Sequence, residues 1–235
     1  MWSIESTESL GRIAVPPHVP PGFAVFCTTR DFEGRLNGDR ANVLTSVVRE
    51  RFGIASSLAT CTQVHGATVH RVTSDDAWRE CDSCDALWSD ESGVSLAIKI
   101  ADCLPVSLID PVQAVIANVH SGWRGAVQRI TAAAIDASDV EPNVAYAYLG
   151  PSIRVCCFEV GEEVASQFDT RYVDRTRAKA HVDLVAFTTD ILRNRGVADE
   201  RISDSGLCTR CDGSVFHSYR RDGTGGGRNL QVVAM

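Results

Sequence analysis

Short runs of apolar residues recur along the chain and predict a protein rich in strands. A run of β-favouring residues over 22–29 predicts one strand. Three apolar runs over 94–100, 106–109 and 114–119 lie close together and predict a block of three strands, because Asp110-Pro111 supplies a turn between the second and third. Further strands are predicted over residues 59–64, 68–72, 144–149, 214–219 and 229–233.

Apolar residues at helical spacing predict helices between these strands. Val43, Val47 and Phe52 fall on one face of a helix over 41–52, which ends at Gly53. The polar stretch over 75–92 is interpreted as an exposed excursion, and the Gly- and charge-rich segment 30–39 as a loop. Since neither a repeat nor a linker is evident, we predict one α+β domain over residues 1–235. Further helices are predicted over 125–137, 159–168 and 181–195.

The composition restricts the classes of protein to consider. The net charge of −7 and the lack of a basic stripe argue against a nucleic-acid binder. The start of the chain lacks the basic and apolar regions of a secretory signal, and no apolar run approaches the ~18 residues of a membrane span. We therefore expect a cytoplasmic protein that binds neither nucleic acid nor membrane. In that setting its nine cysteines are thiols or metal ligands rather than a disulfide framework.

Three potential metal ligands share one sequence context, because each lies beside a predicted turn at the end of a predicted strand. His120 follows the run over 114–119, Cys103 follows the run over 94–100, and His65 separates two short strands. Two imidazoles and one thiolate suit a catalytic zinc ion, with one position left for water or substrate. Their separations of 38 and 17 residues match no local ligand motif, so convergence of the three is a hypothesis. Cys103 as a nucleophile with a histidine base is the alternative.

Arginines near these residues are candidates for binding an anion. Arg124 lies at the start of a predicted helix, where a guanidinium can fork onto a phosphate or carboxylate. Arg220 and Arg221 precede a Gly-rich run and can cradle an anion, although a solvated turn explains them equally well.

The sequence gives weaker evidence that the other cysteines bind a metal ion. Two C-x-x-C pairs, Cys81/Cys84 and Cys208/Cys211, can in principle form a Cys₄ zinc site, but their separation far exceeds that of zinc ribbons. The vicinal pair Cys156-Cys157 is expected to point to opposite faces of a strand, with one thiol buried.

The chain resembles the YfiH family, also called the multicopper polyphenol oxidase (laccase) or peptidoglycan editing factor family. The resemblance runs in order along nearly the whole chain. The motifs that carry it are T-Q-V-H-G (62–66), A-D-C-L-P-V (101–106), V-H-S-G-W-R-G (119–125), L-G-P-S-I (149–153), F-E-V-G (158–161), C-T (208–209) and S-Y-R-R-D (218–222).

This resemblance implies a layered α/β/β/α fold with mixed sheets and one zinc ion per chain, bound by His65, Cys103 and His120. The implied activity is that of a purine nucleoside phosphorylase for adenosine, inosine and methylthioadenosine, with adenosine deamination. The implied partners are therefore small molecules, a purine nucleoside and phosphate. A hydrolase that edits peptidoglycan precursors is the second hypothesis, and a protein with purely structural zinc is the third.

A multicopper oxidase is disfavoured by composition. Such an enzyme needs roughly ten imidazoles for its copper centres, whereas the chain has six histidines. A single copper ion is nevertheless an alternative occupant of the His₂Cys site.

The second hypothesis, the hydrolase, can use either the same metal or Cys103 as nucleophile.

Overall fold

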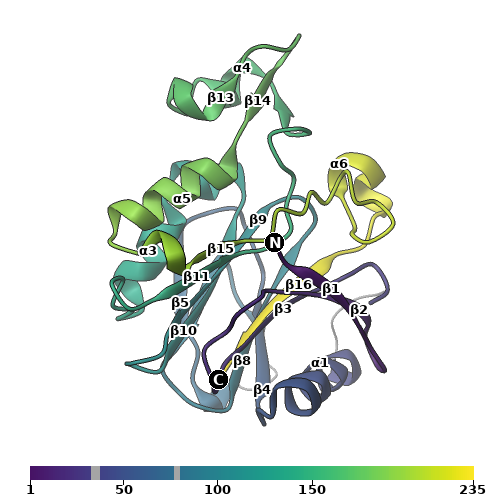
Figure 1. The fold of residues 1–235 in the computed structure, drawn as a ribbon, viewed down its shortest axis with the longest axis vertical. Helices are drawn as coiled ribbons and strands as arrows, with labels where there is room; N and C mark the ends of the chain where they lie inside the picture. Colours follow the sequence, from purple (N-terminus) through teal and green to yellow (C-terminus); the bar gives the residue numbers. More distant parts are fainter. Residues whose placement is uncertain (33–37, 77–79) are drawn as a thin grey trace.

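The computed structural model describes residues 1–32, 38–76 and 80–235, and its centre is a pair of stacked β-sheets (Figure 1). One sheet has seven strands in the order β1-β2-β3-β16-β8-β4-β6, and the other has six in the order β15-β11-β9-β10-β7-β5. The strands of the first sheet, in that order, are Ser3–Thr7, Gly11–Val15, Ala24–Thr28, Asn229–Ala234, Val94–Ile100, Ser57–Cys61 and Glu80–Cys81. Those of the second are Ile202–Asp204, Tyr146–Leu149, Leu104–Asp110, Val115–Ser121, Ala86–Ser89 and Val69–Arg71.

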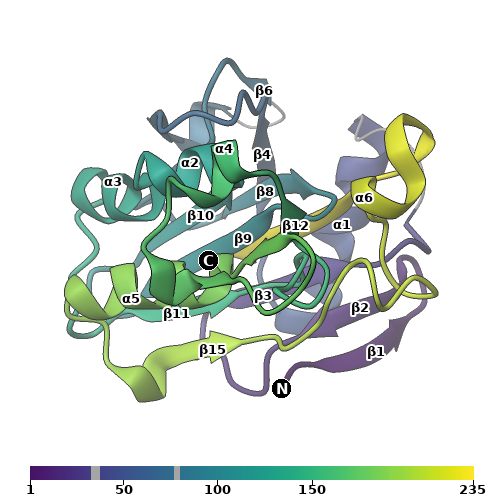
Figure 2. The same cartoon turned by 90° about the horizontal axis from the view of Figure 1, so that it is seen from above.

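Helices cover the outer faces of both sheets, so the layers are α/β/β/α as predicted (Figure 2). Helix α1 (Gly38–Phe52) packs Leu44 and Val48 against the seven-stranded sheet. Helices α3 (Ile130–Ala137) and α5 (Leu184–Asn194) bury apolar side chains against the six-stranded sheet. The shorter helices are α2 (Trp123–Val127), α4 (Glu162–Ala165) and α6 (Tyr219–Asp222), and the 3₁₀ turns are Ser74–Asp76, Thr170–Tyr172, Asp199–Arg201 and Gly223–Gly225.

A buried polar network joins the two sheets at their centre. The Asn118 side-chain amide donates to the carbonyl oxygens of Leu96 and Gln231, both 2.9 Å away, and its oxygen accepts from Ser107 at 3.1 Å. Because side chains alternate along β10, His120 faces the same intersheet space as Asn118, two residues before it. This register directs the His120 imidazole inward at the end of its strand.

A small third sheet projects beyond these layers, at the top of Figure 1. Its strands are β12 (Glu159–Val160), β14 (Ala180–Val182) and β13 (Val173–Asp174). In the part of the chain that the structure describes, no helix is long and apolar enough to cross a membrane.

Most predicted elements are confirmed, including the strand over 22–29 and the helix over 41–52. The predicted three-strand block is wrong, because β8 belongs to the seven-stranded sheet while β9 and β10 pair in the other. The strands β8, β9 and β10 are buried on both faces of their sheets, so an apolar run does not reveal which sheet a strand joins. The strands over 59–64, 68–72, 144–149 and 229–233 are also confirmed, with slightly shifted ends.

Three predicted elements differ in form. The helix over 125–137 is divided into α2 and α3, because Arg129 adopts a left-handed φ of 62° between them. Only Glu162–Ala165 is helical within 159–168, and 214–219 contains no strand, because a turn covers its first two residues and α6 begins at Tyr219. Residues 33–37 of the predicted loop lie outside the described residues.

The stretch 75–92 is not simply an exposed excursion. It contains the fully buried strand β7, which pairs with β10 in the six-stranded sheet, and both Cys81 and Cys84 are buried. The helix predicted over 181–195 begins only at Leu184, and His181 is buried in β14.

Candidate active site

The structure brings His65, Cys103 and His120 together, with their potential ligand atoms within 4.8 Å of one another. His120 is the penultimate residue of β10, and Cys103 lies in the turn that carries the chain from β8 in one sheet to β9 in the other. The β9–β10 register pairs Leu104 with Ser121, which places the preceding Cys103 beside Gly122. The long sequence separations are therefore closed by sheet pairing.

His65 lies in the loop between β4 and β5, with a left-handed φ of 61°. Its Nε2 atom is 3.9 Å from the sulfur of Cys103, and its ring centroid is 4.9 Å from that of His120. His65 is exposed, Cys103 is half-buried and His120 is buried. The group therefore opens toward solvent on the His65 side.

Asp85 holds both histidines. Its carboxylate lies 2.8 Å from His120 Nδ1 and accepts the backbone N–H groups of His65 and Gly66 at 2.9 and 2.7 Å. Because the carboxylate can only accept, it fixes the proton of His120 on Nδ1 and leaves Nε2 for the site. The β7–β10 register sets this contact, since Val119 pairs with Ala86 and the His120 N–H donates to the Asp85 carbonyl at 2.7 Å.

The charges in this group favour a thiolate. Burial raises the pKa of the Cys103 thiol, but hydrogen bonds to His120 and His65 outweigh burial and bring this pKa to about 6. Burial lowers the pKa of His120, and its contacts with Asp85 and Cys103 raise that pKa to about 9. These contacts favour the thiolate, the form in which cysteine binds a metal ion, and His120 must release its Nε2 proton when a metal ion binds.

The donor set and the space around it fit a metal ion. Two imidazole nitrogens and a thiolate are the ligand types that zinc prefers. A Cβ atom at Gly122 would lie 3.0 Å from the Cys103 sulfur and 3.1 Å from a ring carbon of His65, so the glycine keeps this face of the group clear. A histidine that binds a metal ion usually donates its other ring N–H to a carboxylate, and the Asp85–His120 hydrogen bond has this form.

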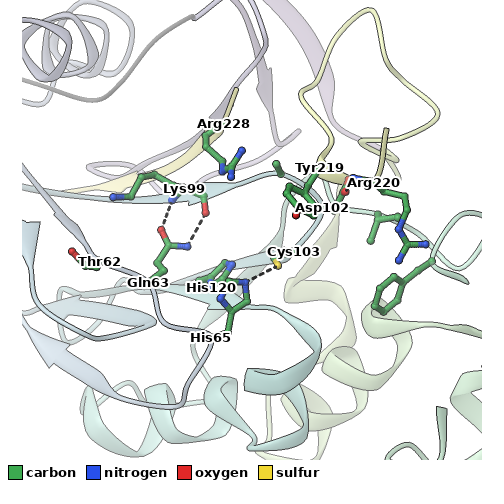
Figure 3. Close-up of a pocket in the computed structure, with 13 residues that line it drawn as sticks. Thr62, Gln63, His65, Lys99, Asp102, Cys103, His120, Tyr219, Arg220 and Arg228 are labelled. Carbon is green, nitrogen blue, oxygen red and sulfur yellow. Dashed lines mark hydrogen bonds between the residues drawn. The ribbon is translucent and has the colours of Figure 1, made fainter. Parts of the chain in front are cut away.

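The three side chains line a cavity of about 570 Å³ (Figure 3). This volume suits a small organic molecule. Besides the three, the cavity wall has three cations, two aromatic rings and several smaller groups. The remaining lining residues are Thr62, Gln63, Lys99, Ala101, Asp102, Ile153, Phe158, Tyr219, Arg220 and Arg228.

The three arginines selected from the sequence lie in different places. Arg220 lines the cavity and donates to the Glu159 carbonyl at 2.9 Å. Arg124 is exposed, its guanidinium lies 4.4 Å from the Trp123 ring centroid, and it is not part of the cavity wall. Arg221 is not part of the cavity wall, and its donors are used by the carbonyls of Thr209, Arg210 and Phe216 and by the Asp222 carboxylate.

Several residues of the site were missed by sequence reasoning. Asp85 was hidden in a stretch interpreted as an exposed excursion, although the apolar run Ala86-Leu87-Trp88 beside it indicates a strand. Arg228 and Lys99 also line the cavity without having been selected. Phe158 and Tyr219 had appeared only within the family motifs.

A second group of potential metal ligands consists of Cys156, Cys157, Cys208 and Cys211. The prediction that Cys156 and Cys157 point to opposite faces of a strand is wrong, because they lie in a turn and their sulfurs are 3.6 Å apart. One of the two is buried, as expected. The rejection of a site that joins Cys81 and Cys84 to the other C-x-x-C pair is consistent with this grouping.

Comparison with known proteins defines the class to which this fold and site belong. The family model described as "Multi-copper polyphenol oxidoreductase laccase" matches residues 32–235. A purine nucleoside phosphorylase of Deinococcus radiodurans is 34% identical over 212 residues, which are 84% of this chain and 80% of the relative. The adenosine deaminase RL5, from an unknown prokaryotic organism, is 36% identical over 160 residues, 63% of this chain and 61% of the relative.

The fold also matches a solved structure. The crystal structure of YlmD from Geobacillus stearothermophilus superposes with a TM-score of 0.79 at 26% identity, covering 92% of this chain and 93% of that one. The chain belongs to the YfiH family. Its relatives carry enzyme names, which supports an enzymatic role for this chain.

Proposed function

We propose that this protein is a zinc-dependent purine nucleoside enzyme. Its principal reaction is the phosphate-dependent cleavage of the N-glycosidic bond of adenosine, inosine or methylthioadenosine, and it also deaminates adenosine. The observation that carries the proposal is the combination, in one cavity, of the His65–Cys103–His120 group with cations and aromatic rings. The names of the relatives support the choice of substrate class.

His65, Cys103 and His120 would hold the zinc ion and leave one position open to substrate or water. When bound, zinc supplies a Lewis acid that stabilises negative charge developing on a neighbouring atom. The Asp85 carboxylate keeps the His120 ring in the orientation that presents Nε2 to the site.

Arg220 and Arg228 are the best placed residues to bind phosphate. Within the described part of the chain, neither guanidinium forms a salt bridge, whereas Lys99 is paired with Glu80 at 2.5 Å. An unpaired guanidinium retains its charge and its planar fork for two phosphate oxygens. We therefore assign phosphate to these two arginines rather than to Arg124 or Arg221.

The reaction needs phosphate and nucleoside held in fixed orientation. A phosphate oxygen forms the new bond to the anomeric carbon of ribose as the bond to the purine nitrogen breaks, and that bonding pair leaves with the purine. Holding both reactants together converts a bimolecular reaction into an effectively unimolecular one. Tyr219, which lines the cavity, offers an aromatic ring to the purine, and the Phe158 ring lies under the Arg220 guanidinium, 5.7 Å from the ring centroid.

Asp102 positions this wall of the cavity rather than reacting itself. Its carboxylate accepts the Thr209 hydroxyl and the Arg220 backbone N–H, each at 2.6 Å. Asp102 also has a left-handed φ of 91°, a conformation that is rare for a non-glycine residue and must be maintained by its surroundings. The contacts to Asp102 fix the start of α6, and with it Arg220, relative to Cys103.

The oxidase named in the family description is not supported by the site. All six histidines lie in the described residues, and only His65 and His120 belong to a potential metal-binding group there. A multicopper oxidase needs a blue-copper site and a separate trinuclear cluster, which these ligands do not supply.

The proposal is tested by incubating the zinc-loaded protein with inosine or adenosine, with and without inorganic phosphate. We expect free purine base and ribose 1-phosphate in equal amounts, formed only when phosphate is present. Inosine formation from adenosine without phosphate reports the deaminase activity. Release of an amino acid from a muropeptide precursor, with no nucleoside turnover, would instead support the peptidoglycan-editing hydrolase.

A further inference from the structure

Four cysteines from two distant segments meet in a group that is separate from the His65–Cys103–His120 group and does not line the cavity. Cys156 and Cys157 lie in the turn after β11, and Cys208 and Cys211 lie in the turn after β15. An isolated bridge between Ser152 and Cys208 aligns the two segments. The four thiols are free, with Cys157 and Cys208 buried and Cys156 and Cys211 exposed.

The distances between the sulfurs have the size that a single tetrahedral ion requires. Cys156 lies 3.6, 3.7 and 3.8 Å from the sulfurs of Cys157, Cys208 and Cys211, and Cys157 lies 3.3 Å from Cys211. A zinc ion with four thiolates at about 2.3 Å places those sulfurs about 3.8 Å apart. A cubic iron–sulfur cluster does not fit as well, because each thiolate then binds a different iron and the sulfurs lie farther apart.

We propose that Cys156, Cys157, Cys208 and Cys211 form a second, structural zinc site with four thiolate ligands. Four ligands close the coordination sphere, as in structural sites, whereas the three ligands in the cavity leave one position open. The two sites therefore have different roles in the same protein.

Basic groups around the four cysteines support a site with excess negative charge, since four thiolates and one zinc ion carry a net charge of −2. The Arg210 guanidinium lies near Cys157, and the Arg177 guanidinium donates to the Cys156 carbonyl at 2.8 Å. Hydrogen bonds to ligand residues orient them and tune the metal. The turn itself is closed by the Asp212 N–H, which donates to the Cys208 carbonyl at 2.9 Å.

The position of these cysteines indicates what the ion does. The segment that carries Cys156 and Cys157 also contributes Ile153 and Phe158 to the cavity wall. Thr209, next to Cys208, donates to Asp102. A metal ion that joins the two segments would fix this wall, including the ring of Phe158 and the carboxylate that holds the start of α6.

The experiment counts metal rather than turnover, so its result is independent of the proposed nucleoside chemistry. Protein purified without added metal or chelator is analysed for zinc, copper and iron, together with inorganic sulfide and the number of reactive thiols. We expect about two zinc ions per chain in the wild type and about one in the double variant Cys208→Ser/Cys211→Ser. The variant His120→Ala should also retain about one, since it removes only the cavity ion.

A second measurement covers the case in which the double variant does not fold. Cobalt replaces zinc in the His120→Ala protein, whose remaining site should show the intense near-ultraviolet thiolate-to-cobalt absorption of a sulfur-only site. That absorption should fall in His120→Ala/Cys156→Ser, where one exposed ligand is lost, and persist in the matched control His120→Ala/Cys27→Ala. Cys27 is buried and belongs to neither group.

The possible outcomes separate this inference from its alternatives. Two zinc ions without nucleoside turnover would support this inference and contradict the proposed function. One zinc ion, with the four cysteines protected as disulfides until reduced, would overturn the structural site. Iron with inorganic sulfide would overturn it in favour of a cluster, and copper in place of zinc would overturn the assignment of the metal.

Discussion

The Asp85 carboxylate lies 2.8 Å from His120 Nδ1 and at the same time accepts the backbone N–H of His65 at 2.9 Å. One side chain therefore fixes two of the three cavity ligands, although they come from different parts of the chain. The cost of burying this carboxylate is offset by these contacts, because burial raises the pKa of Asp85 but hydrogen bonds to His120 and to the backbone bring it below its usual value.

Replacing Asp85 by Asn should weaken metal binding in the cavity. The amide has one acceptor oxygen instead of two and no charge, so it cannot hold both His65 and His120 as the carboxylate does. We expect roughly a 10–100-fold loss of zinc affinity, the range found for residues behind metal ligands. Competition with a zinc-binding dye measures it in the Cys208→Ser/Cys211→Ser background, and Asp90→Asn, which removes an exposed partner of Arg71, is the control. Equal affinity with and without Asp85→Asn in that background would remove Asp85 from this role.

Replacing Gly122 by Ala should disturb the same site by steric contact alone. The backbone φ of −66° at Gly122 is accessible to alanine, but the new Cβ would lie 3.0 Å from the Cys103 sulfur and 3.1 Å from His65. We expect weaker zinc binding with little loss of thermal stability. Gly225→Ala is a matched control, because a Cβ there meets nothing within 4 Å. Unchanged zinc affinity in Gly122→Ala would show that the ligands lie farther from this backbone than the structure places them.

Replacing Arg228 by Gln should impair phosphate binding. Loss of a hydrogen bond to a charged group costs about 1.5–3 kcal/mol, which corresponds to a rise in the apparent KM for phosphate of roughly 10–100-fold. The KM for inosine should change much less. Arg220→Gln should behave in the same way, because its backbone contact with Asp102 is retained.

Arg124→Gln is the control for the phosphate experiment. Its exposed guanidinium lies over Trp123 and outside the cavity, so its apparent phosphate affinity should equal that of the wild type. A large effect in Arg124→Gln with none in Arg228→Gln would transfer the phosphate site to the start of α2, one of the positions indicated by the sequence.

Replacing Tyr219 by Ala should impair nucleoside binding rather than phosphate binding. The ring lines the cavity and is 52% exposed, so its loss removes contact surface without opening the core. Aromatic contacts of this kind contribute about 0.5–1.5 kcal/mol, and we expect the KM for inosine to rise several-fold. Tyr219→Phe keeps the ring and should leave this KM unchanged. An equal effect of both substitutions would indicate that the hydroxyl, not the ring, contacts the substrate.

The ligands of the cavity site could be predicted because each lies next to a turn or strand end that the sequence indicates. His120 follows an apolar run, and Cys103 is followed by Pro105. Their convergence could not be predicted from spacing, since it depends on the pairing of Leu104 with Ser121 and of Ala86 with Val119 in a sheet. The family motifs supplied the information that spacing lacks.

The residues around the ligands were harder to predict. Asp85 lies in a polar stretch of the sequence that is typical of a loop. Only the structure, in which Asp85 and the adjacent strand β7 are buried, shows that its carboxylate points into the protein. Cys208 and Cys211 form a group of potential ligands with Cys156 and Cys157 rather than with the other C-x-x-C motif. The reason is that the turns carrying these two segments lie side by side. Arg129 interrupts a continuous helical pattern through a left-handed φ that its sequence does not indicate.

The central claim is that phosphate-dependent nucleoside cleavage depends on the ion held by His65, Cys103 and His120. The most direct measurement follows ribose 1-phosphate formation from inosine while zinc is returned stepwise to metal-free protein. It uses the Cys208→Ser/Cys211→Ser variant, or the wild type if that variant does not fold. We predict no product in metal-free protein, a rise in rate in proportion to occupancy of the cavity site, and no recovery in His120→Ala. Full turnover by the metal-free protein, or no ribose 1-phosphate at full zinc occupancy, would contradict the account.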